Sequence, residues 1–304
     1  MRRLLVVLAA CGSRAPQPPL APLPPLPADA GTAAPHSALE PGDPPPSAPE
    51  GDPIAIGFVP PKAGDSWQLV TDDDSVIDTV WAKGDTPRKH QETVRKFDYR
   101  ATVVETAGDH PSKLDVSIAT AHEIVDLGDQ HQDEELLRGG YLVAAGGTPD
   151  SFGHGGVTAR RSDGAPLGDR EREELESLFT QTLSGADPLP RVLAASPLRL
   201  HETRTLDPDQ TRAMMGELPQ TAKMSVALIA ADPDHHRATL ELDLSAHDTA
   251  NGVTVDGGVR AILVYDTVTG ALVDGKNVAR RVEVIEDMTT TTTARGTRQL
   301  VRLR

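Results

Sequence analysis

The chain has 304 residues, of which 45 are acidic and 30 are basic, so its formal net charge is −15 at pH 7. A surface this acidic repels phosphate backbones and argues against nucleic acid as a partner. The single cysteine excludes an internal disulfide, and because aromatic residues make up only 3% of the chain, any core has to be built mainly from Val, Leu, Ile and Ala.

The chain begins with the pattern of an export signal. Arg2 and Arg3 precede a run of apolar residues at 4–8, and small residues follow. This order of charged, apolar and small residues is typical of a secretory signal peptide, and a run this short cannot span a bilayer. We therefore expect residues 1–10 to be a signal that is removed on export.

The sequence Leu-Ala-Ala-Cys at residues 8–11 resembles the lipobox of bacterial lipoproteins. The resemblance implies cleavage between Ala10 and Cys11, a diacylglycerol on the Cys11 thiol and an acyl chain on the new amine. Two or three acyl chains hold a soluble domain on a bilayer almost permanently. Gly12 and Ser13 follow, rather than an aspartate, which by the same resemblance implies the outer membrane. The alternative is an ordinary cleaved signal with an incidental or buried thiol.

Residues 11–53 are predicted to form a disordered tether behind the lipidated cysteine, because 14 of residues 12–53 are proline. Such sequences favour polyproline II, which at about 3.1 Å per residue would reach on the order of 130 Å when fully extended. The chain thus resembles the uncharacterised, Pro-rich-tethered lipoproteins of Gram-negative bacteria. The resemblance implies a cell-envelope location, with the domain facing the periplasm or the cell surface.

Residues 54–185 are predicted to form a first β lobe that ends in a helix. Alternating apolar and polar residues predict strands at 67–70, 76–81, 97–105, 114–121, 141–145 and 157–161. In the following segment, 169–184, apolar residues fall at helical spacing, and Gly185 is placed to end the helix. The acidic runs 72–74 and 126–135 lack the spacing of a calcium loop and are expected to be solvated loops.

Residues 186–304 are predicted to form a second β lobe. It opens with a short helix at 207–215, for which Asp207 is the N-cap and Pro208 the first helical residue. Strands are then predicted at 224–231, 238–245, 259–267, 271–274, 278–286 and 299–303. Five threonines at 289–293 have high strand propensity but little apolar content, so we expect segment 287–296 to be an exposed edge or a long hairpin.

The second lobe echoes the first at offsets near 126 residues, which suggests an internal duplication, although chance similarity between two meanders explains it equally well. The predicted fold class is α+β and predominantly antiparallel β. In it, two pseudo-repeated β meanders share one core, with one main amphipathic helix between them.

The proposed repeat would place His122 and Glu123 at a strand end equivalent to that of His247 and Asp248. If the two lobes packed about a pseudo-twofold axis, these four side chains could converge, and imidazoles with carboxylates suit zinc or copper. The alternative is that each of them is solvated at its strand end.

Ser66 follows Gly64 and Asp65, as in the first block of the GDSL-type hydrolases, which the sequence resembles here, and His235 lies in the Asp-x-x-His spacing that this family uses late in the chain. However, no apolar strand precedes Ser66 and no Gly-x-Asn-Asp block follows it. We therefore favour a structural turn at Ser66 over a nucleophile.

These patterns predict no enzyme and no cofactor. The leading hypothesis is a membrane-anchored lipoprotein whose non-catalytic β-rich domain binds or scaffolds an envelope protein. One alternative is a carrier that holds an apolar ligand in a pocket of a curved sheet. A less favoured alternative is a serine hydrolase that uses Ser66 and His235.

Overall fold

The computed structural model describes residues 49–81, 89–146, 156–184, 189–215, 221–250 and 252–303. The predicted signal, the lipobox residues Ala10 and Cys11, and most of the tether lie outside these ranges. The strands are β1 (Glu50–Ile54), β2 (Ser66–Trp81), β3 (Lys89–Ala107), β4 (His110–Leu127), β5 (Gln130–Glu135), β6 (Gly139–Ala145), β7 (Val157–Arg161), β8 (Leu198–Leu200), β9 (Thr203–Thr205), β10 (Lys223–Asp232), β11 (Arg237–Ala250), β12 (Val253–Asp266), β13 (Leu272–Ile285) and β14 (Met288–Arg302). The helices are α1 (Asp169–Ser184), α2 (Leu189–Ala195) and α3 (Pro208–Met215).

One 12-stranded antiparallel sheet dominates the described part of the chain. Its order is β7-β6-β4-β3-β2-β14-β13-β12-β11-β10-β9, and β5 pairs with β4 alongside β6. β1 and β8 form a separate two-stranded sheet. The prediction of a mostly antiparallel β fold is therefore confirmed, while the internal duplication stays a prediction.

The pairing of β2 with β14 makes the sheet continuous. It runs without a break from Met288 opposite Trp81 to Arg302 opposite Trp67, so the two predicted lobes, 54–185 and 186–304, share one sheet. The exposed-edge alternative for 287–296 is wrong, because β14 lies between β13 and β2. The alternative of a long hairpin is confirmed, because β13 and β14 pair in antiparallel register up to Ile285 opposite Met288. A central position requires hydrogen-bonding neighbours on both sides rather than an apolar sequence, and β-branched threonines suit a half-buried strand.

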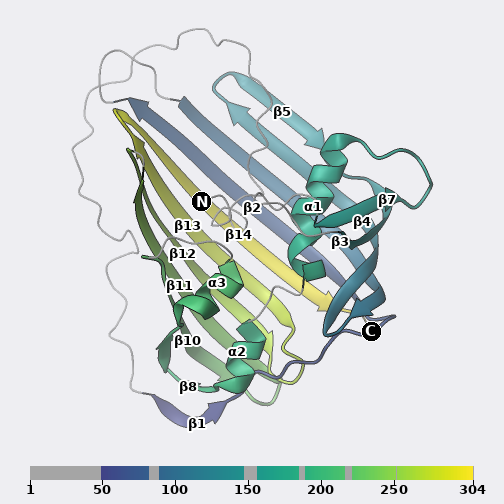
Figure 1. Ribbon diagram of the computed structural model, residues 1–304, viewed down its shortest axis with the longest axis vertical. Coiled ribbons are helices and arrows are strands. Elements are labelled where there is room, and N and C mark those ends of the chain that lie inside the picture. The colour runs from purple at the N-terminus through teal and green to yellow at the C-terminus, as the bar shows by residue number, and fades with distance from the viewer. Residues whose placement is uncertain are drawn as a thin grey trace.

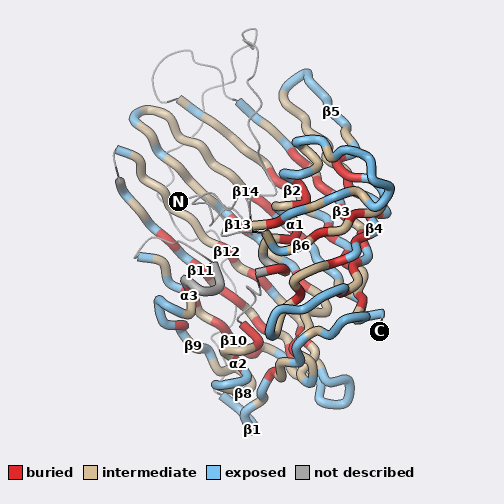
Figure 2. The backbone as a smooth tube through the Cα atoms, turned by 45° about the vertical axis from the view of Figure 1, so that its right-hand side comes forward, coloured by how far each residue is buried: buried red, intermediate tan, exposed pale blue. Residues whose placement is uncertain are grey.

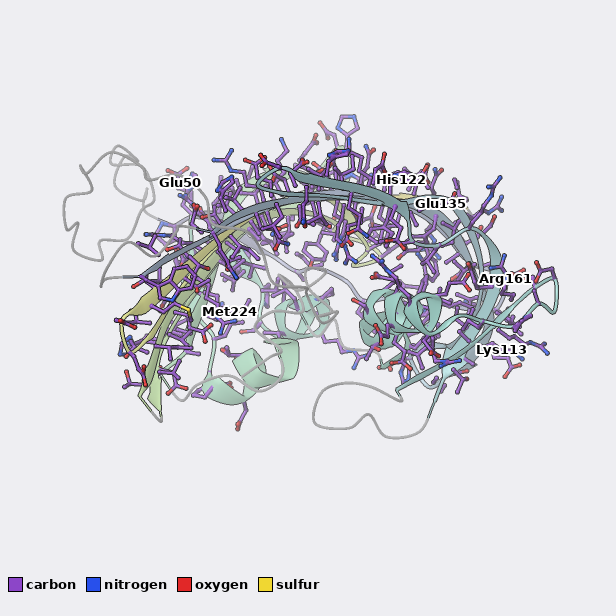
Figure 3. The ribbon with its side chains drawn as sticks, turned by 90° about the horizontal axis from the view of Figure 1, so that it is seen from above. Glu50, Lys113, His122, Glu135, Arg161 and Met224 are labelled. Carbon is purple, nitrogen blue, oxygen red and sulfur yellow. The ribbon has the colours of Figure 1, made fainter. Side chains whose placement is uncertain are left out.

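The sheet curves into an arch, and the described helices lie on its concave side (Figures 1 and 3). α1 packs against β4, β6 and β7, and α3 packs against β10. No described helix lies over the ends of β2, β13 and β14 at the upper left of Figure 1. We call this region, where Trp81, Ile285 and Met288 lie, the open end of the sheet.

Helix α1 closes one flank of the arch, and its predicted bounds are confirmed. Leu175, Phe179 and Leu183 repeat every four residues on one face, are buried, and pack with residues of β3, β4 and β6. The Phe179 ring meets the edge of Tyr99, with 5.2 Å between the ring centroids. Such an aromatic pair adds specific geometry to the burial of apolar area.

A second apolar cluster fills the other flank. Leu189 and Leu193 of α2 pack there with residues of β10, β11 and β12. α3 begins as predicted, because the Gln210 N–H donates to Asp207 Oδ1 at 2.7 Å. The expectation of one shared core is wrong for the described residues, since the buried apolar side chains, whose backbone is red in Figure 2, form two clusters and α1 belongs to only one of them.

We expect Phe179→Ala to lower the free energy of unfolding by about 3–5 kcal/mol, because it leaves a cavity between α1 and the sheet. Urea denaturation followed by circular dichroism measures this loss. Glu173→Ala, on the exposed side of the same helix, is the matched control and should change the stability little. Equal effects of the two substitutions would contradict the packing described for α1.

Candidate functional site on the concave face

A row of polar residues crosses the concave face between the two apolar clusters. Residues directly opposite each other in neighbouring strands share a face of the sheet, and the register aligns Arg95, Asp73, Gly296 and Asn277 across β3, β2, β14 and β13. Arg95 donates to Glu174 of α1 at 2.6 Å, so this row lies on the helix-covered side. The centre of the arch is therefore polar.

Two side-chain oxygens converge above Gly296. A Cβ atom at this position would clash with Asp73 Oδ1 and would lie 2.7 Å from Asn277 Oδ1. The backbone of Gly296 does not adopt a positive φ, so glycine is required here by the space that these oxygens occupy. We call Asp73, Asn277, Gly296 and Arg298 the central polar site.

Arg298 contributes a cation to this site. It lies two residues from Gly296 on the same face of β14, opposite Thr71 of β2, and it is exposed. Within the described residues it forms no ion pair. Burial raises the pKa of Tyr99 to about 12, and the positive charge of Arg298 opposes this shift.

Asp73 is an unusual carboxyl group for a strand in the middle of a sheet. Burial raises its pKa, and the positive charges of Arg298 and Arg95 only partly offset that effect. Its neighbours Asp72 and Asp74 lie on the convex face and are exposed. The expectation that 72–74 form a solvated loop is therefore wrong, because all three lie in β2 and alternation directs only the middle one inward.

A network of ion pairs, buried at Arg95 and partly exposed at Arg170, borders the site on the α1 side. Arg95, which is 4% exposed, donates to Glu123 at 2.7 Å and to Glu174 at 2.6 Å. Arg170 at the start of α1 donates to Glu123 at 2.9 Å and also pairs with Glu134 of β5. Burial raises the pKa of Glu174, although Arg95 opposes the shift. The second expected acidic loop, 126–135, instead belongs largely to the β4–β5 hairpin.

Apolar side chains line the same concave face at the open end. The register aligns Trp81, Met288, Ile285 and Val253 across β2, β14, β13 and β12. All four are only partly buried, as is Ile77 between this row and the central polar site. We call Trp81, Met288, Ile285 and Val253 the apolar row.

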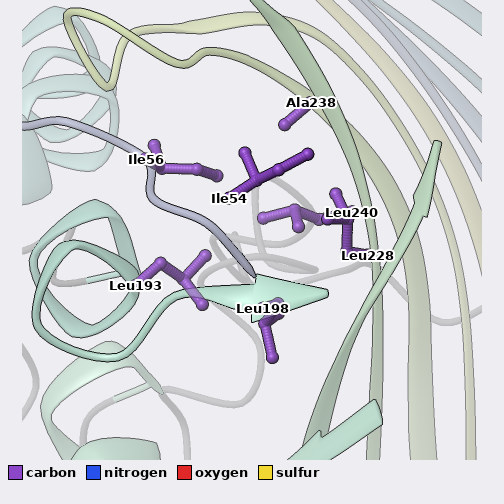
Figure 4. Close-up of a pocket in the computed structure, with 7 residues that line it drawn as sticks. All are labelled: Ile54, Ile56, Leu193, Leu198, Leu228, Ala238 and Leu240. Carbon is purple, nitrogen blue, oxygen red and sulfur yellow. The ribbon is translucent and has the colours of Figure 1, made fainter. Parts of the chain in front are cut away.

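An apolar crevice lies within the second cluster, between β1, α2 and the sheet (Figure 4). Its empty volume is about 180 Å³, it is too narrow for a water-sized sphere, and it is lined by Ile54, Ile56, Leu193, Leu198, Leu228, Ala238 and Leu240. Ligand pockets typically hold roughly 300–1,000 Å³. The crevice is therefore part of the packed core and is too small for an acyl chain.

The four candidate metal ligands do not come together. β4 and β11 are separated by six strand spacings, which is about 29 Å along the sheet. His122 pairs with Asp133 at 2.8 Å, and His247 pairs with Asp256 at 2.5 Å. Glu123 forms ion pairs with Arg95 and Arg170. The described residues contain no group of three or more potential ligands. The expected convergence of these side chains is wrong, since the sheet is continuous and does not fold about a twofold axis.

Ser66 and His235 are also far apart. Four strand spacings, about 19 Å along the sheet, separate β2 from the β10–β11 turn. Ser66 is 2% exposed and His235 pairs locally with Asp232 at 2.7 Å. The register therefore rules out a direct hydrogen bond between the two proposed catalytic side chains.

Sequence reasoning missed the central polar site. A signal was present in the alternation of β2, since one acid among three consecutive aspartates must face inward once 66–81 is read as one strand. Asn277, Gly296 and Arg298 carried no such signal, because their proximity to Asp73 depends on the pairing of β14 with β2 and β13.

No family model and no curated protein matches this chain. Among solved structures, the chain is similar to a lipovitellin that was studied for its lipid–protein interactions, with 7% sequence identity and a TM-score of 0.41. The match covers 79% of this chain but only 25% of the lipovitellin, so the chain spans about a quarter of that protein's length. The translocator domain of the autotransporter NalP from Neisseria meningitidis is 4% identical with a TM-score of 0.22, covering 78% of this chain and 89% of that domain.

A LolA superfamily protein from Nitrosomonas europaea is 10% identical with a TM-score of 0.11, and the match covers 79% of this chain and 86% of that protein. These low TM-scores establish neither a shared fold nor a shared function. In the described part of the chain, no helix has the length and apolar character needed to cross a bilayer.

We expect Asp73→Asn to raise the melting temperature at pH 7. Burial raises the pKa of Asp73 above its value in the unfolded chain. At a pH above this raised pKa, the ionised carboxylate therefore destabilises the native state. As the pH falls, protonation of Asp73 removes this destabilisation. The stabilisation by Asn should therefore shrink in acid. Differential scanning calorimetry from pH 7 to pH 3 measures the change in melting temperature. Asp74→Asn, on the opposite face of the sheet, is the control. A melting temperature of Asp73→Asn below that of the unmodified protein at pH 7 would contradict the prediction.

We expect Arg95→Met to lower the free energy of unfolding by about 3–5 kcal/mol, because it removes the cation that Glu174 and Glu123 share in a buried site. Lys96→Met removes an adjacent cation whose pair with Asp72 is exposed, so it should cost about 0–1 kcal/mol. Denaturant titration distinguishes the two, and similar losses would show that the buried network does not hold α1.

Proposed function

We propose that this protein is an exported lipoprotein, anchored to the outer membrane through acyl chains on Cys11, whose domain binds an amphiphilic, lipid-like ligand on the concave face of the sheet. The role is binding rather than catalysis. The lipobox resemblance of residues 8–11 supports the anchor. The proline-rich tether that follows supports a domain held at a distance from the bilayer.

One observation carries the choice of ligand: the concave face combines the central polar site with the half-buried apolar row on the same strands. Binding sites for small molecules are mostly apolar and contain a few placed polar groups that orient the ligand. The two surfaces are eight residues apart on β14, about 26 Å along the strand, so an amphiphile with a long acyl chain could contact both. Because the crevice in Figure 4 is too small for an acyl chain, the ligand's chain lies on the apolar row at the open end.

The convex face has the composition of a solvent-exposed surface. Its ion pairs and charged side chains alternate in sign, as in Lys96 with Asp72 and Arg260 with Glu241. The exposed valines on this face, such as Val70 and Val278, do not line up in neighbouring strands. The contrast between the two faces favours the concave one for the ligand.

The anchor predicts that the native protein incorporates radiolabelled palmitate and partitions into the detergent phase. Cys11→Ser should abolish both, because the thioether requires the thiol. Intact-mass analysis of the native protein gives the direct measurement. Recovery of an unmodified thiol from membranes would contradict the anchor but would leave ligand binding by the domain open to its own test.

The ligand site predicts that full-length Cys11→Ser protein, purified without detergent, binds a fluorescent 16-carbon fatty acyl probe saturably. Met288→Asp should weaken binding at least tenfold, because it buries a charge against the acyl chain. Val80→Asp, next to Trp81 but on the exposed convex face, is the matched control. Absence of saturable binding, or equal losses in both variants, would contradict the proposed function.

A further inference from the structure

We propose that five side chains on the convex side of the sheet, next to the open end, form a clamp that holds four strands together when its two histidines are protonated and loosens when they are neutral. These residues, which we call the proton clamp, are Asp78, His90, Glu92, Asp126 and His131. The clamp itself is independent of the proposed function, whereas its control of ligand binding rests on that function.

The register brings the five side chains together. Asp78 of β2 lies directly opposite His90 of β3, and Glu92, two residues along β3, lies on the same face as His90. Glu92 is directly opposite Asp126 of β4, and Asp126 is directly opposite His131 of β5. Neighbouring strands are about 4.8 Å apart, so each side chain is within reach of the next. The clamp is therefore a continuous chain of ionisable groups across β2, β3, β4 and β5.

His90 lies between two carboxylates. Its Nδ1 is 2.9 Å from Asp78 Oδ1, and its Nε2 is 3.0 Å from Glu92 Oε1. An ionised carboxylate only accepts hydrogen bonds, so both ring nitrogens can bond to these groups only when each nitrogen carries a proton. This geometry favours the charged imidazolium over either neutral tautomer.

Glu92 and Asp126 place two negative charges at directly opposite positions of β3 and β4. Like charges in such a pair oppose strand pairing. His131 Nδ1 is 2.6 Å from Asp126 Oδ1, so each acid of the pair has an imidazole as its other neighbour. Protonated histidines offset the repulsion between the two acids, and neutral histidines leave it in place.

The pKa values of both histidines are shifted in the direction that this arrangement requires. The hydrogen bonds to Asp78 and to Glu92 raise the pKa of His90, and the hydrogen bond to Asp126 raises the pKa of His131. A group whose pKa is raised in the native state stabilises that state when protonated, and this stabilisation is lost as the pH rises through the raised pKa. The clamp therefore tightens as the pH falls from 8 towards 6.

The surroundings of the clamp are mostly acidic and favour protonation. The described helices all lie on the concave side, and β14 places the uncharged Thr291 opposite Asp78 (Figure 3). Lys89 lies on the concave face, and the cation Lys96 pairs with Asp72 at 3.3 Å. The other charged or titratable groups near the clamp on the convex side of β2–β5 and in the β4–β5 turn are Asp74, His122, Asp129, Asp133 and Glu135.

The clamp lies behind the surface on which we place the ligand's chain. Asp78 is three residues from Trp81, the member of the apolar row on β2, and faces the opposite side of the sheet. Loosening of β2 from β3 at Asp78 would let the end of β2 that carries Trp81 separate from its neighbours. Because His90 is 47% exposed, water screens its ion pairs and we expect a graded effect rather than an all-or-none one.

Hydrogen–deuterium exchange of full-length Cys11→Ser protein tests the clamp without a ligand. Mass spectrometry at pH 6 and pH 8 gives exchange rates, which are corrected for the intrinsic rate at each pH. We expect peptides from 76–81, 89–95 and 122–135 to exchange at least twofold more slowly at pH 6, and peptides of β13 to show no such difference. The difference should shrink in 1 M salt, which screens exposed charges. Equal corrected rates at the two pH values would overturn the inference.

Variants assign the effect to the clamp. His90→Gln and His131→Gln should each remove at least half of the difference, because glutamine forms hydrogen bonds but carries no charge. His235→Gln is the matched control, since His235 pairs only with the local Asp232, at 2.7 Å, among the described residues. Glu92→Gln should slow exchange at pH 8, because it removes one of two opposed charges, whereas the loss of a merely structural contact would speed it. Faster exchange of Glu92→Gln at pH 8, or equal effects of His235→Gln and His90→Gln, would contradict the clamp.

Titration with the fluorescent acyl probe tests control of the ligand. We expect the dissociation constant of Cys11→Ser protein to be at least twofold lower at pH 6 than at pH 8, and the difference to shrink when His90→Gln and His131→Gln are combined. This comparison also accounts for ionisation of the probe. A pH difference in binding that is equal with and without the two histidines would overturn control of the ligand by the clamp. Absence of probe binding at both pH values would contradict the proposed function, and the exchange rates would still decide whether the clamp exists.

Discussion

The antiparallel pairing of β2 with β14 is the constraint on which the rest of this molecule depends. It joins a strand from the beginning of the domain to the last strand of the chain over their whole length, from Trp81 opposite Met288 to Trp67 opposite Arg302. Without it the molecule would be two separate meanders, each with its own apolar cluster. With it the sheet is continuous, the arch has a single concave face, and Asp73 lies beside Gly296 and Asn277 at the centre of that face.

The two apolar clusters stabilise the flanks of the arch, and the polar centre between them is the proposed recognition site. Burial of Leu175, Phe179 and Leu183 on one flank, and of the α2 residues on the other, supplies hydrophobic stabilisation at the sides of the arch. The central strands instead place an acid with a raised pKa and an exposed arginine where an ordinary core would have aliphatic residues. Positions that cost stability in this way are typical of functional sites, where selection for binding opposes selection for packing.

Much of the local structure could be predicted from the sequence, but the pairing could not. Helix α1 and the start of α3 followed from spacing and capping residues, and most strands followed from alternation. Alternation does not show which strands are neighbours. The threonine-rich segment of β14 could therefore be assigned to an edge or to a hairpin, and a metal site that joins His122 to His247 could be considered until the sheet order was known. Asp73 shows the same limit, because its inward direction was encoded in β2, whereas its partners Asn277 and Arg298 are some 200 residues further along the chain and approach it only through tertiary structure.

The way the chain enters the domain has a mechanical consequence. β1 follows directly after most of the predicted tether and pairs only with the short strand β8, outside the large sheet, at the end of the arch opposite the open end (Figure 1). Just after it, Gly57 N–H donates to the Thr267 carbonyl at 2.8 Å. A Cβ at Gly57 would clash with the Val268 carbonyl and one at Gly270 would clash with the Gly57 carbonyl, so neither position has room for a side chain. A pulling force on the chain before β1 would therefore first separate β1 from β8 and strain the contact between Gly57 and Gly270. The hydrogen bonds between the long strands of the concave face would carry the force only after that contact had broken.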